Sequence, residues 1–229
     1  MPTFDRLPAN AWLAYAYLEA RVPFPSPYFE SRNALEFVDS GGRANLVRAF
    51  GFREGKPDPP AELLVQGQFW RFGESAGGHH FAVDLCRSSM PTQIVVACIE
   101  PGETLESTWK ALEQAMVGTR ARPMFMPGDR LLVPNAFWQV RHTFVELSKG
   151  EVISPPGFPA ISAVQEIRFR LDKSGVELQS SADLKLLGGG AEDLRLNRPF
   201  LLYLKKRGAD QPFFVMWVDN AELLQPWTS

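Results

Sequence analysis

The sequence has little of what metal and catalytic sites are made of. Its 229 residues include two cysteines and three histidines. His79 and His80 follow two glycines, where we expect a solvent-facing turn rather than half of a metal site. His142 and Glu146 have the i, i+4 spacing of two ligands on a helix, but the alternation around them is typical of a strand. We therefore expect no metal and no cofactor.

An excess of charge of one sign and a long apolar run are also missing. Lys plus Arg number 24 and Asp plus Glu number 26, which gives a formal charge of −2. This balance indicates neither a nucleic-acid partner nor an anionic membrane. The longest apolar runs, Ile94 to Ile99 and Phe200 to Leu204, are far below the roughly 18 residues of a membrane span. With no signal peptide recognised, a cytoplasmic location is the default expectation.

The two cysteines are not expected to form a disulfide. Both lie in a predicted hairpin whose turn is Arg87 to Gln93, and this pairing puts Cys98 opposite Ala82 rather than opposite Cys86. We expect two buried thiols, whose apolar surroundings raise the thiol pKa and leave them inert.

What the sequence does contain is mostly the pattern of strands, with 17 Phe and 6 Trp to fill a core. Trp12, Tyr15 and Leu18 recur at helical spacing, which predicts a helix over Asn10 to Glu19. A second helix is predicted after Thr104, which can cap it. The predicted strands are Ala34 to Val38, Asn45 to Phe52, Leu63 to Phe72, Phe81 to Cys86, Ile94 to Ile99, Arg130 to Leu147 with a break at Pro134-Asn135, Ser162 to Leu171, Pro199 to Lys205 and Pro212 to Val218.

Residues 172–198 break this pattern. They are polar and short-chained and carry Gly188, Gly189 and Gly190. An irregular stretch of this length inside a domain is typically either disordered or functional. The three glycines are not a phosphate loop, because they lack the Gly-x-x-x-x-Gly-Lys pattern and no helical pattern follows them. No pair of carboxylates sits where one would be held protonated, so we expect no enzyme.

From this stretch onward the sequence resembles the carboxy-terminal part of a serpin. In that family an extended strand leads through a hinge into an exposed reactive loop, and an Arg-Pro-Phe strand and a final apolar strand follow. The corresponding segments here are Val164 to Leu171, the hinge Gly175, Val176, Glu177 and Leu178, the loop to Leu194, Asn197 to Phe200, and Phe214 to Val218. Counting along the loop puts the scissile region at Leu186, Leu187, Gly188, Gly189 and Gly190, with Leu186 or Leu187 as the recognised side chain.

Residues 61–100 resemble three adjacent serpin strands, and the order of the following elements also fits the family. The resemblance covers about two thirds of the chain. It implies an α+β, mainly β fold, namely a truncated serpin-like fold with few helices. We expect a single serpin-like domain over residues 1–229, in which residues 1–60 are poorly matched and residues 61–229 carry the sheets and the reactive-loop region.

The departures from the family bear on mechanism. The chain is much shorter than a serpin, and Leu147 to Ala163 show no sign of the family's helix there. The family's inhibitors carry small residues in the hinge, whereas Leu178 is bulky. The resemblance implies that a cut loop inserts into a large sheet beside Val164 to Leu171. The second neighbour is expected in Ala34 to Val38 or Asn45 to Phe52, which are short, so we expect cleavage to stabilise the protein little.

Three interpretations of residues 175–194 stay open: a connector between strands, a bait loop that a protease cuts without being trapped, and a trapping inhibitor. The first hypothesis for the whole chain is a protease-inhibitor-like protein, substrate-like or weak in trapping, whose partner is a serine or cysteine protease. The second is a non-inhibitory interaction scaffold, whose large sheet is completed by another chain.

Overall fold

The computed structural model describes residues 12–18, 24–52, 59–75, 78–87, 91–143, 160–174 and 192–228. Contacts between Cα atoms divide the chain into two units. The first comprises residues 1–20 and 137–170, and the second comprises residues 21–136 and 171–229. The single-domain organisation expected from the sequence stays a prediction.

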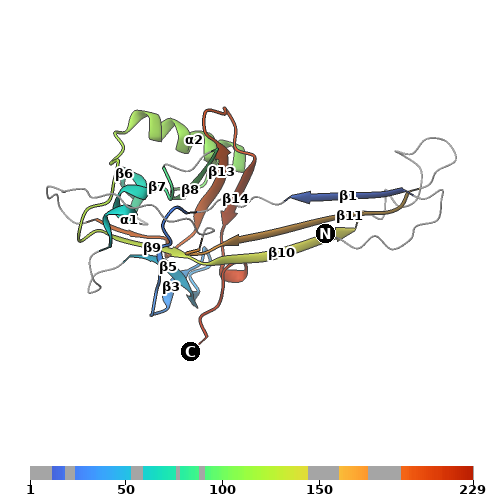
Figure 1. The fold of residues 1–229 in the computed structure, drawn as a ribbon, viewed down its shortest axis with the longest axis horizontal. Helices are drawn as coiled ribbons and strands as arrows, with labels where there is room; N and C mark the ends of the chain where they lie inside the picture. Colours follow the sequence, from blue (N-terminus) through green and yellow to red (C-terminus); the bar gives the residue numbers. More distant parts are fainter. Residues whose placement is uncertain are drawn as a thin grey trace. The chain divides into compact units, whose positions relative to one another are not determined.

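A three-stranded sheet in the order β1-β11-β10 belongs mainly to the first unit (Figure 1). Its strands are β1 (Trp12–Leu18), β10 (Ala136–Thr143) and β11 (Ala160–Leu171). Strand β1 runs parallel to β11, with its last residue Leu18 opposite Ile167. The helix predicted over Asn10 to Glu19 is therefore wrong. A run of seven apolar and aromatic residues suits a strand as well as a helix, and the pairing with β11 decides between them.

A five-stranded antiparallel sheet forms the larger part of the second unit, in the order β14-β13-β8-β7-β6. Its strands are β6 (Gln68–Ser75), β7 (Gly78–Asp84), β8 (Thr92–Cys98), β13 (Phe200–Lys206) and β14 (Phe214–Val218). Residues Ala61–Gln66 form the short helix α1 instead of the start of a strand. His79 and His80 lie in β7, so the turn expected there is wrong as well.

Helix α2 (Leu105–Gly118) covers one face of this sheet. Thr104 caps it as predicted, because its hydroxyl accepts from the amide of Ser107 while the Ser107 hydroxyl bonds back to the backbone of Thr104. From α2, Leu112 is buried in the core, and Trp109 and Met116 pack against it. The strand residues of this core are Trp70, Ala82, Val95, Ala97, Leu201 and Tyr203.

Two smaller sheets complete the second unit. A four-stranded sheet has the order β12-β9-β5-β2, with β2 (Phe29–Glu30), β5 (Ala49–Phe52), β9 (Arg130–Pro134) and β12 (Asp193–Arg195). Strands β3 (Leu35–Val38) and β4 (Ala44–Val47) form a hairpin, and a 3-10 turn, η1 (Ala221–Leu223), follows near the end. The single strand predicted over Asn45 to Phe52 is thus two strands in different sheets. The change falls at Arg48, whose amide donates to the carbonyl of Gln225.

The α+β, mainly β fold class predicted from the sequence is confirmed. Cys86 and Cys98 are buried and form no disulfide, although Cys98 pairs with Phe81 rather than with Ala82. Within the described residues, none of the helices has the length and apolar character needed to cross a bilayer.

Candidate functional site

The hinge residues Gly175, Val176, Glu177 and Leu178 and the scissile region Leu186, Leu187, Gly188, Gly189 and Gly190 lie outside the described residues. What the structure describes is the chain at either end of this segment. These two ends differ in how they are held.

The amino-terminal end leaves β11 at the buried residue Leu171. Two residues later the carbonyl of Lys173 accepts a hydrogen bond of 3.2 Å from the amide of Tyr28. The Lys173 ammonium lies 3.8 Å from a carboxylate oxygen of Glu30, and both side chains are substantially exposed. An exposed pair at this distance contributes little to stability. Ser174 then closes a local turn by donating to the carboxylate of Asp172 at 2.7 Å.

The carboxyl-terminal end begins at Glu192, which is bound through both its backbone and its side chain. The Glu192 amide donates to Asp129 Oδ1 at 2.7 Å, and the Glu192 carbonyl accepts from the amide of Arg130 at 2.7 Å. Its two carboxylate oxygens pair with different arginines, Arg71 Nη1 at 2.6 Å and Arg122 Nη1 at 2.9 Å. The Glu192 side chain is 16% exposed, so these ion pairs are partly shielded from water.

Strand β12 follows directly and fixes the chain to β9. The two strands run parallel, with Leu194 opposite Leu131. Leu194 and Leu196 are both buried, and the amide of Leu196 donates to the carbonyl of Leu132 at 3.0 Å. The carboxyl-terminal end is thus held by ion pairs, backbone hydrogen bonds and apolar burial together. The predicted extension of the loop to Leu194 is therefore wrong, because Leu194 is buried in β12.

Asp129 is a buried carboxylate at this end of the segment, and its surroundings shift its pKa. It is almost fully buried, and burial raises the pKa of its carboxyl above the usual value, with the nearby Glu192 carboxylate acting in the same direction. The amides of Met126 and Glu192, which donate to it, and the charge of Arg122 act against the rise. The carboxylate serves as an acceptor that orders the chain on both sides.

A Gly-x-Ser-x-Gly pattern occurs once, from Gly73 to Gly77, and its local structure bears on the expectation that the protein is not an enzyme. A hydrolase nucleophile of this type sits on a sharp turn between a strand and a helix. Here Ser75 ends β6 and pairs with Gly78, the first residue of the antiparallel strand β7. The hairpin is a different context from the hydrolase turn, although His80 lies nearby in β7 with its Nε2 3.4 Å from a carboxylate oxygen of Glu100.

The thiol chemistry predicted from the sequence is confirmed for one cysteine. Burial raises the pKa of Cys98 to about 11, so the reactive thiolate is scarce at neutral pH. In the part of the chain that the structure describes, no group of three or more His, Cys, Asp or Glu side chains is arranged to hold a metal ion.

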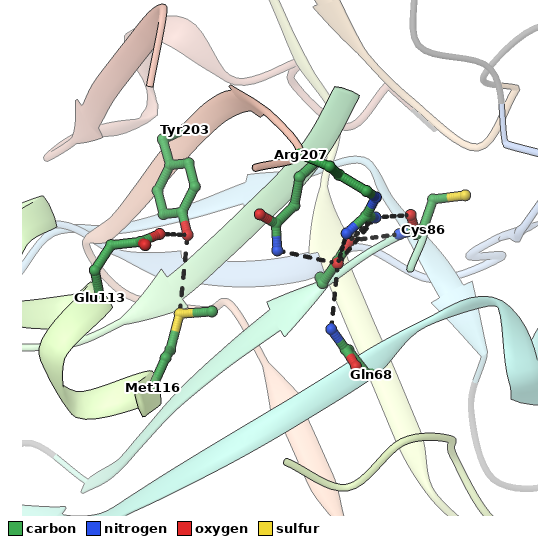
Figure 2. A network of polar contacts seen from close by, with 8 residues as sticks. Gln68, Cys86, Glu113, Met116, Tyr203 and Arg207 are labelled. Carbon is green, nitrogen blue, oxygen red and sulfur yellow. Dashed lines mark hydrogen bonds and ion pairs between the residues drawn. The ribbon is translucent and has the colours of Figure 1, made fainter. Parts of the chain in front are cut away.

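A buried polar network at one end of the five-stranded sheet has a structural role (Figure 2). The Asp84 carboxylate is fully buried and accepts from both terminal nitrogens of Arg207, and the amide of Cys86 also donates to it. Gln68 and Gln93 donate to the same carboxylate at 3.4 and 3.1 Å. These contacts tie β6, β7, β8 and the residue that follows β13 together.

No family model matches the sequence, and no match is found among curated proteins. Solved structures do match this chain. Three of them are a protease inhibitor, a binding globulin and a serpin by name. Mouse protein Z-dependent protease inhibitor aligns with a TM-score of 0.55 at 14% identity, over 95% of this chain and 57% of its own. Thyroxine-binding globulin in complex with thyroxine gives 0.53 at 12%, over 95% and 59%. A serpin from the trematode Schistosoma haematobium gives 0.53 at 13%, over 90% and 56%.

The chain has a serpin-like fold over part of a serpin's length. The structural likeness reaches beyond the two thirds of the chain that resemble a serpin in sequence, while the chain spans little more than half the length of the structures it matches. At 12–14% identity the likeness concerns the fold alone.

Proposed function

We propose that this chain is a serpin-like protein that offers residues 175–191 to a serine or cysteine protease as a reactive-centre-type loop. We further propose that the protease cuts the loop as a substrate and is trapped weakly or not at all. The chain itself performs no catalysis in this proposal. Its serpin-like fold is the starting point, and the loop and its partner go beyond that fold.

The observation that carries the proposal is the unequal anchoring of the segment. Before it, Lys173 is tied by one backbone hydrogen bond and a long, exposed ion pair. After it, Glu192 and β12 are held by short ion pairs, backbone bonds and burial. A cut between these ends would leave the amino-terminal part free to move while the carboxyl-terminal part stays in place. That is the asymmetry a loop-insertion mechanism needs.

The sheet around β11 supports the same proposal. A segment that follows β11 and turns back would run antiparallel to β11, and also to β1, because β1 and β11 are parallel. Strand β11 lies between β1 and β10, so the segment could pair with both β1 and β11 only by parting their parallel ladder, and it would then form antiparallel hydrogen bonds with each. The bulk of Leu178 in the hinge argues for slow insertion, and slow insertion lets the protease finish hydrolysis and leave.

A panel of proteases tests the proposal. After incubation with trypsin-like, chymotrypsin-like, elastase-like and papain-like enzymes, denaturing gels and mass spectrometry should show cleavage within residues 175–191 and no protease adduct of higher mass. A clear adduct would restore the trapping mechanism. First cuts elsewhere, for example at residues 56–60, would contradict the loop.

Specificity can be tested in the same assay. If Leu186 or Leu187 is the recognised side chain, replacing both by Ser should reduce the chymotrypsin cut in the loop at least tenfold. The matched control is Leu178→Ser, which changes a leucine of the hinge and should leave that rate unchanged. Equal losses in the two variants would place the recognised residue elsewhere.

The second candidate function is a non-inhibitory interaction scaffold. It is favoured by the bulk of Leu178 in the hinge, and two of the matched structures are an inhibitor and a binding protein by name. One of these is named as a binding globulin rather than an inhibitor. Resistance of residues 175–191 to all the enzymes of the panel would favour this candidate over the first.

A further inference from the structure

The contacts of Glu192 set a limit to the segment that a protease can reach. We propose that Glu192 is the positioning residue that fixes the carboxyl-terminal boundary of the loop. In this role it keeps the peptide bonds of β12 out of a protease's reach. The inference rests on the proposed function only in taking residues 175–191 as the exposed segment.

The first support is that Arg122, which holds one Glu192 oxygen, is itself fixed. Arg122 and Phe69 exchange backbone hydrogen bonds of 2.8 and 3.1 Å. The Arg122 guanidinium also lies 5.3 Å from the centre of the Phe69 ring. Phe69 is fully buried and stacks on Phe125 at 5.3 Å. Since little freedom is left to Arg122, its bond to Glu192 costs little further ordering.

The second support is that the contacts come from separate parts of the unit. Arg71 lies in β6 of the five-stranded sheet, Arg122 in the segment after α2, and Asp129 just before β9 of the four-stranded sheet. Glu192 therefore joins elements that are far apart in sequence. A residue bound in this way is harder to lift out than one held only by its neighbours.

The third support is that β12 is short and is paired on one side only. It has three residues at the edge of its sheet and pairs with one strand, β9. The next carboxylate, Asp193, is 38% exposed and contacts Arg195, two residues away, and Arg130 at 3.6 Å. Exposed pairs of this kind add little. Short edge strands open locally unless something holds their ends, and Glu192 is placed to do so.

Trypsin gives a direct test, because its two nearest sites lie on opposite sides of the boundary. Lys185 precedes Glu192 in the proposed loop, and Arg195 follows it in β12. In the wild-type protein we expect rapid cutting after Lys185 and slow cutting after Arg195. Glu192→Gln should speed cutting after Arg195 about tenfold, because a bond to a charged group is lost. Cutting after Lys185 should stay unchanged.

The control variants use neighbouring charges. Asp193→Asn removes the adjacent, exposed carboxylate and should change cutting after Arg195 less than twofold. Arg122→Gln should reproduce Glu192→Gln, and the double variant should exceed either single variant only slightly, since both remove one shared contact. Hydrogen exchange on the uncut proteins gives a second measurement: the Leu196 amide should exchange about tenfold faster in Glu192→Gln.

Three results would overturn the proposal. The first is unchanged cutting after Arg195 in Glu192→Gln, and the second is an equal effect of Asp193→Asn. The third is an equal rise in cutting after Lys205 and Lys206 of β13, which would indicate that the whole unit unfolds. A wild-type protein that resists trypsin at Lys185 would instead count against the proposed function. The response of Arg195 and of the Leu196 amide would still decide the role of Glu192.

Discussion

Glu113 links helix α2 to the five-stranded sheet through two side chains of β13. Its carboxylate accepts the hydroxyl of Tyr203 and pairs with the Lys205 ammonium at 2.6 Å (Figure 2 shows the Tyr203 contact). Tyr203 is fully buried, and burial raises the pKa of its phenol, with the Glu113 carboxylate adding to the rise. The phenol thus remains a donor at all ordinary pH values, and it needs an acceptor.

We predict that Glu113→Ala lowers the free energy of unfolding by about 2 kcal/mol, because the Tyr203 hydroxyl and the Lys205 ammonium both lose their partner. At this chain length the thermal midpoint should fall by about 4–8 °C. The control on the same helix is Glu106→Ala, whose carboxylate is 67% exposed and pairs with Lys110 one turn on. Calorimetry should show a clearly smaller change for the control, and equal falls would contradict the prediction.

Asp129 should make stability depend on pH in a direction opposite to that of a typical ion-paired carboxylate. Its folded-state pKa is raised, chiefly by burial, above its value in the unfolded chain. Its contribution to the free energy of unfolding is therefore full below the pKa that it has in the unfolded chain, and it is lost as the pH rises through the pKa of the folded state. Urea unfolding of the wild type and of Asp129→Asn from pH 7 to pH 4 should show the wild type gaining relative to the variant as the pH falls. A constant or reversed difference would refute this assignment.

The sequence could not reveal the Glu192 contacts. Arg71 and Arg122 lie 121 and 70 residues before Glu192, and nothing local marks them as partners. The hinge and the scissile region follow from the resemblance and from composition, so they are assigned by position along the chain. Contacts between distant residues depend on how β6, β9 and β12 come together, which composition and spacing do not encode.

At the scale of elements, the pattern of the sequence is reliable where a strand is buried on both faces or a helix carries its own cap. Residues Ile94 to Ile99 and the helix after Thr104 are found where predicted. Trp12–Leu18 is the main error, because seven apolar residues in a row fit either periodicity. Helix α1 is missed for a related reason, since its six residues are too few to show a helical period.

Strand β5 has one position that only glycine can fill. Gly51 has a φ of +142°, and a Cβ atom there would lie 1.9 Å from the carbonyl oxygen of Leu131 in the neighbouring strand β9. Both the backbone conformation and the close approach exclude a side chain.

We predict that Gly51→Ala costs about 3 kcal/mol, from strain and from forcing β5 and β9 apart. The thermal midpoint should fall by about 6–12 °C. Gly118→Ala is the matched control, because Gly118 ends α2 and has no heavy atom within 4 Å of an added Cβ. Its midpoint should stay or rise slightly, since alanine favours the helix. A tolerated Gly51→Ala would mean that the β5–β9 contact is looser than described.

At the scale of the whole molecule, the effect of cutting the loop depends on which strands lie beside β11. The sequence places the second neighbour of an inserted strand in Ala34 to Val38 or Asn45 to Phe52, and this placement is wrong. Those residues form most of the β3–β4 hairpin and strand β5 of the four-stranded sheet. The strand that pairs with β11 is β1, over the whole length of β1. The expectation that cleavage stabilises the protein little rests on the lack of a second neighbour for the inserted strand. Strand β1 is such a neighbour, so this reason no longer holds.

The rate at which the cut segment inserts and the stability that insertion would add are therefore two separate questions. The bulk of Leu178 slows insertion, so the protease escapes and the protein behaves as a substrate. Once the protease has left, however, the cut segment has unlimited time to add between β1 and β11. Insertion would replace one parallel ladder by two antiparallel ladders and would bury Val176 and Leu178 on one face.

We therefore predict that cleavage within residues 175–191 raises the thermal midpoint by about 10 °C or more. Each added ladder bond contributes roughly 0.5–1.5 kcal/mol net, and burial of Leu178 contributes about 2 kcal/mol. A total of about 5 kcal/mol corresponds to roughly 10–20 °C at this chain length. Calorimetry on intact and nicked protein measures the rise. Leu178→Asp is the control, because a carboxylate on the buried face opposes insertion without affecting the cut, and its nicked form should gain much less. A midpoint that does not rise in the nicked wild type would show that the sheet cannot take up the segment, and it would favour the interaction scaffold over the protease substrate.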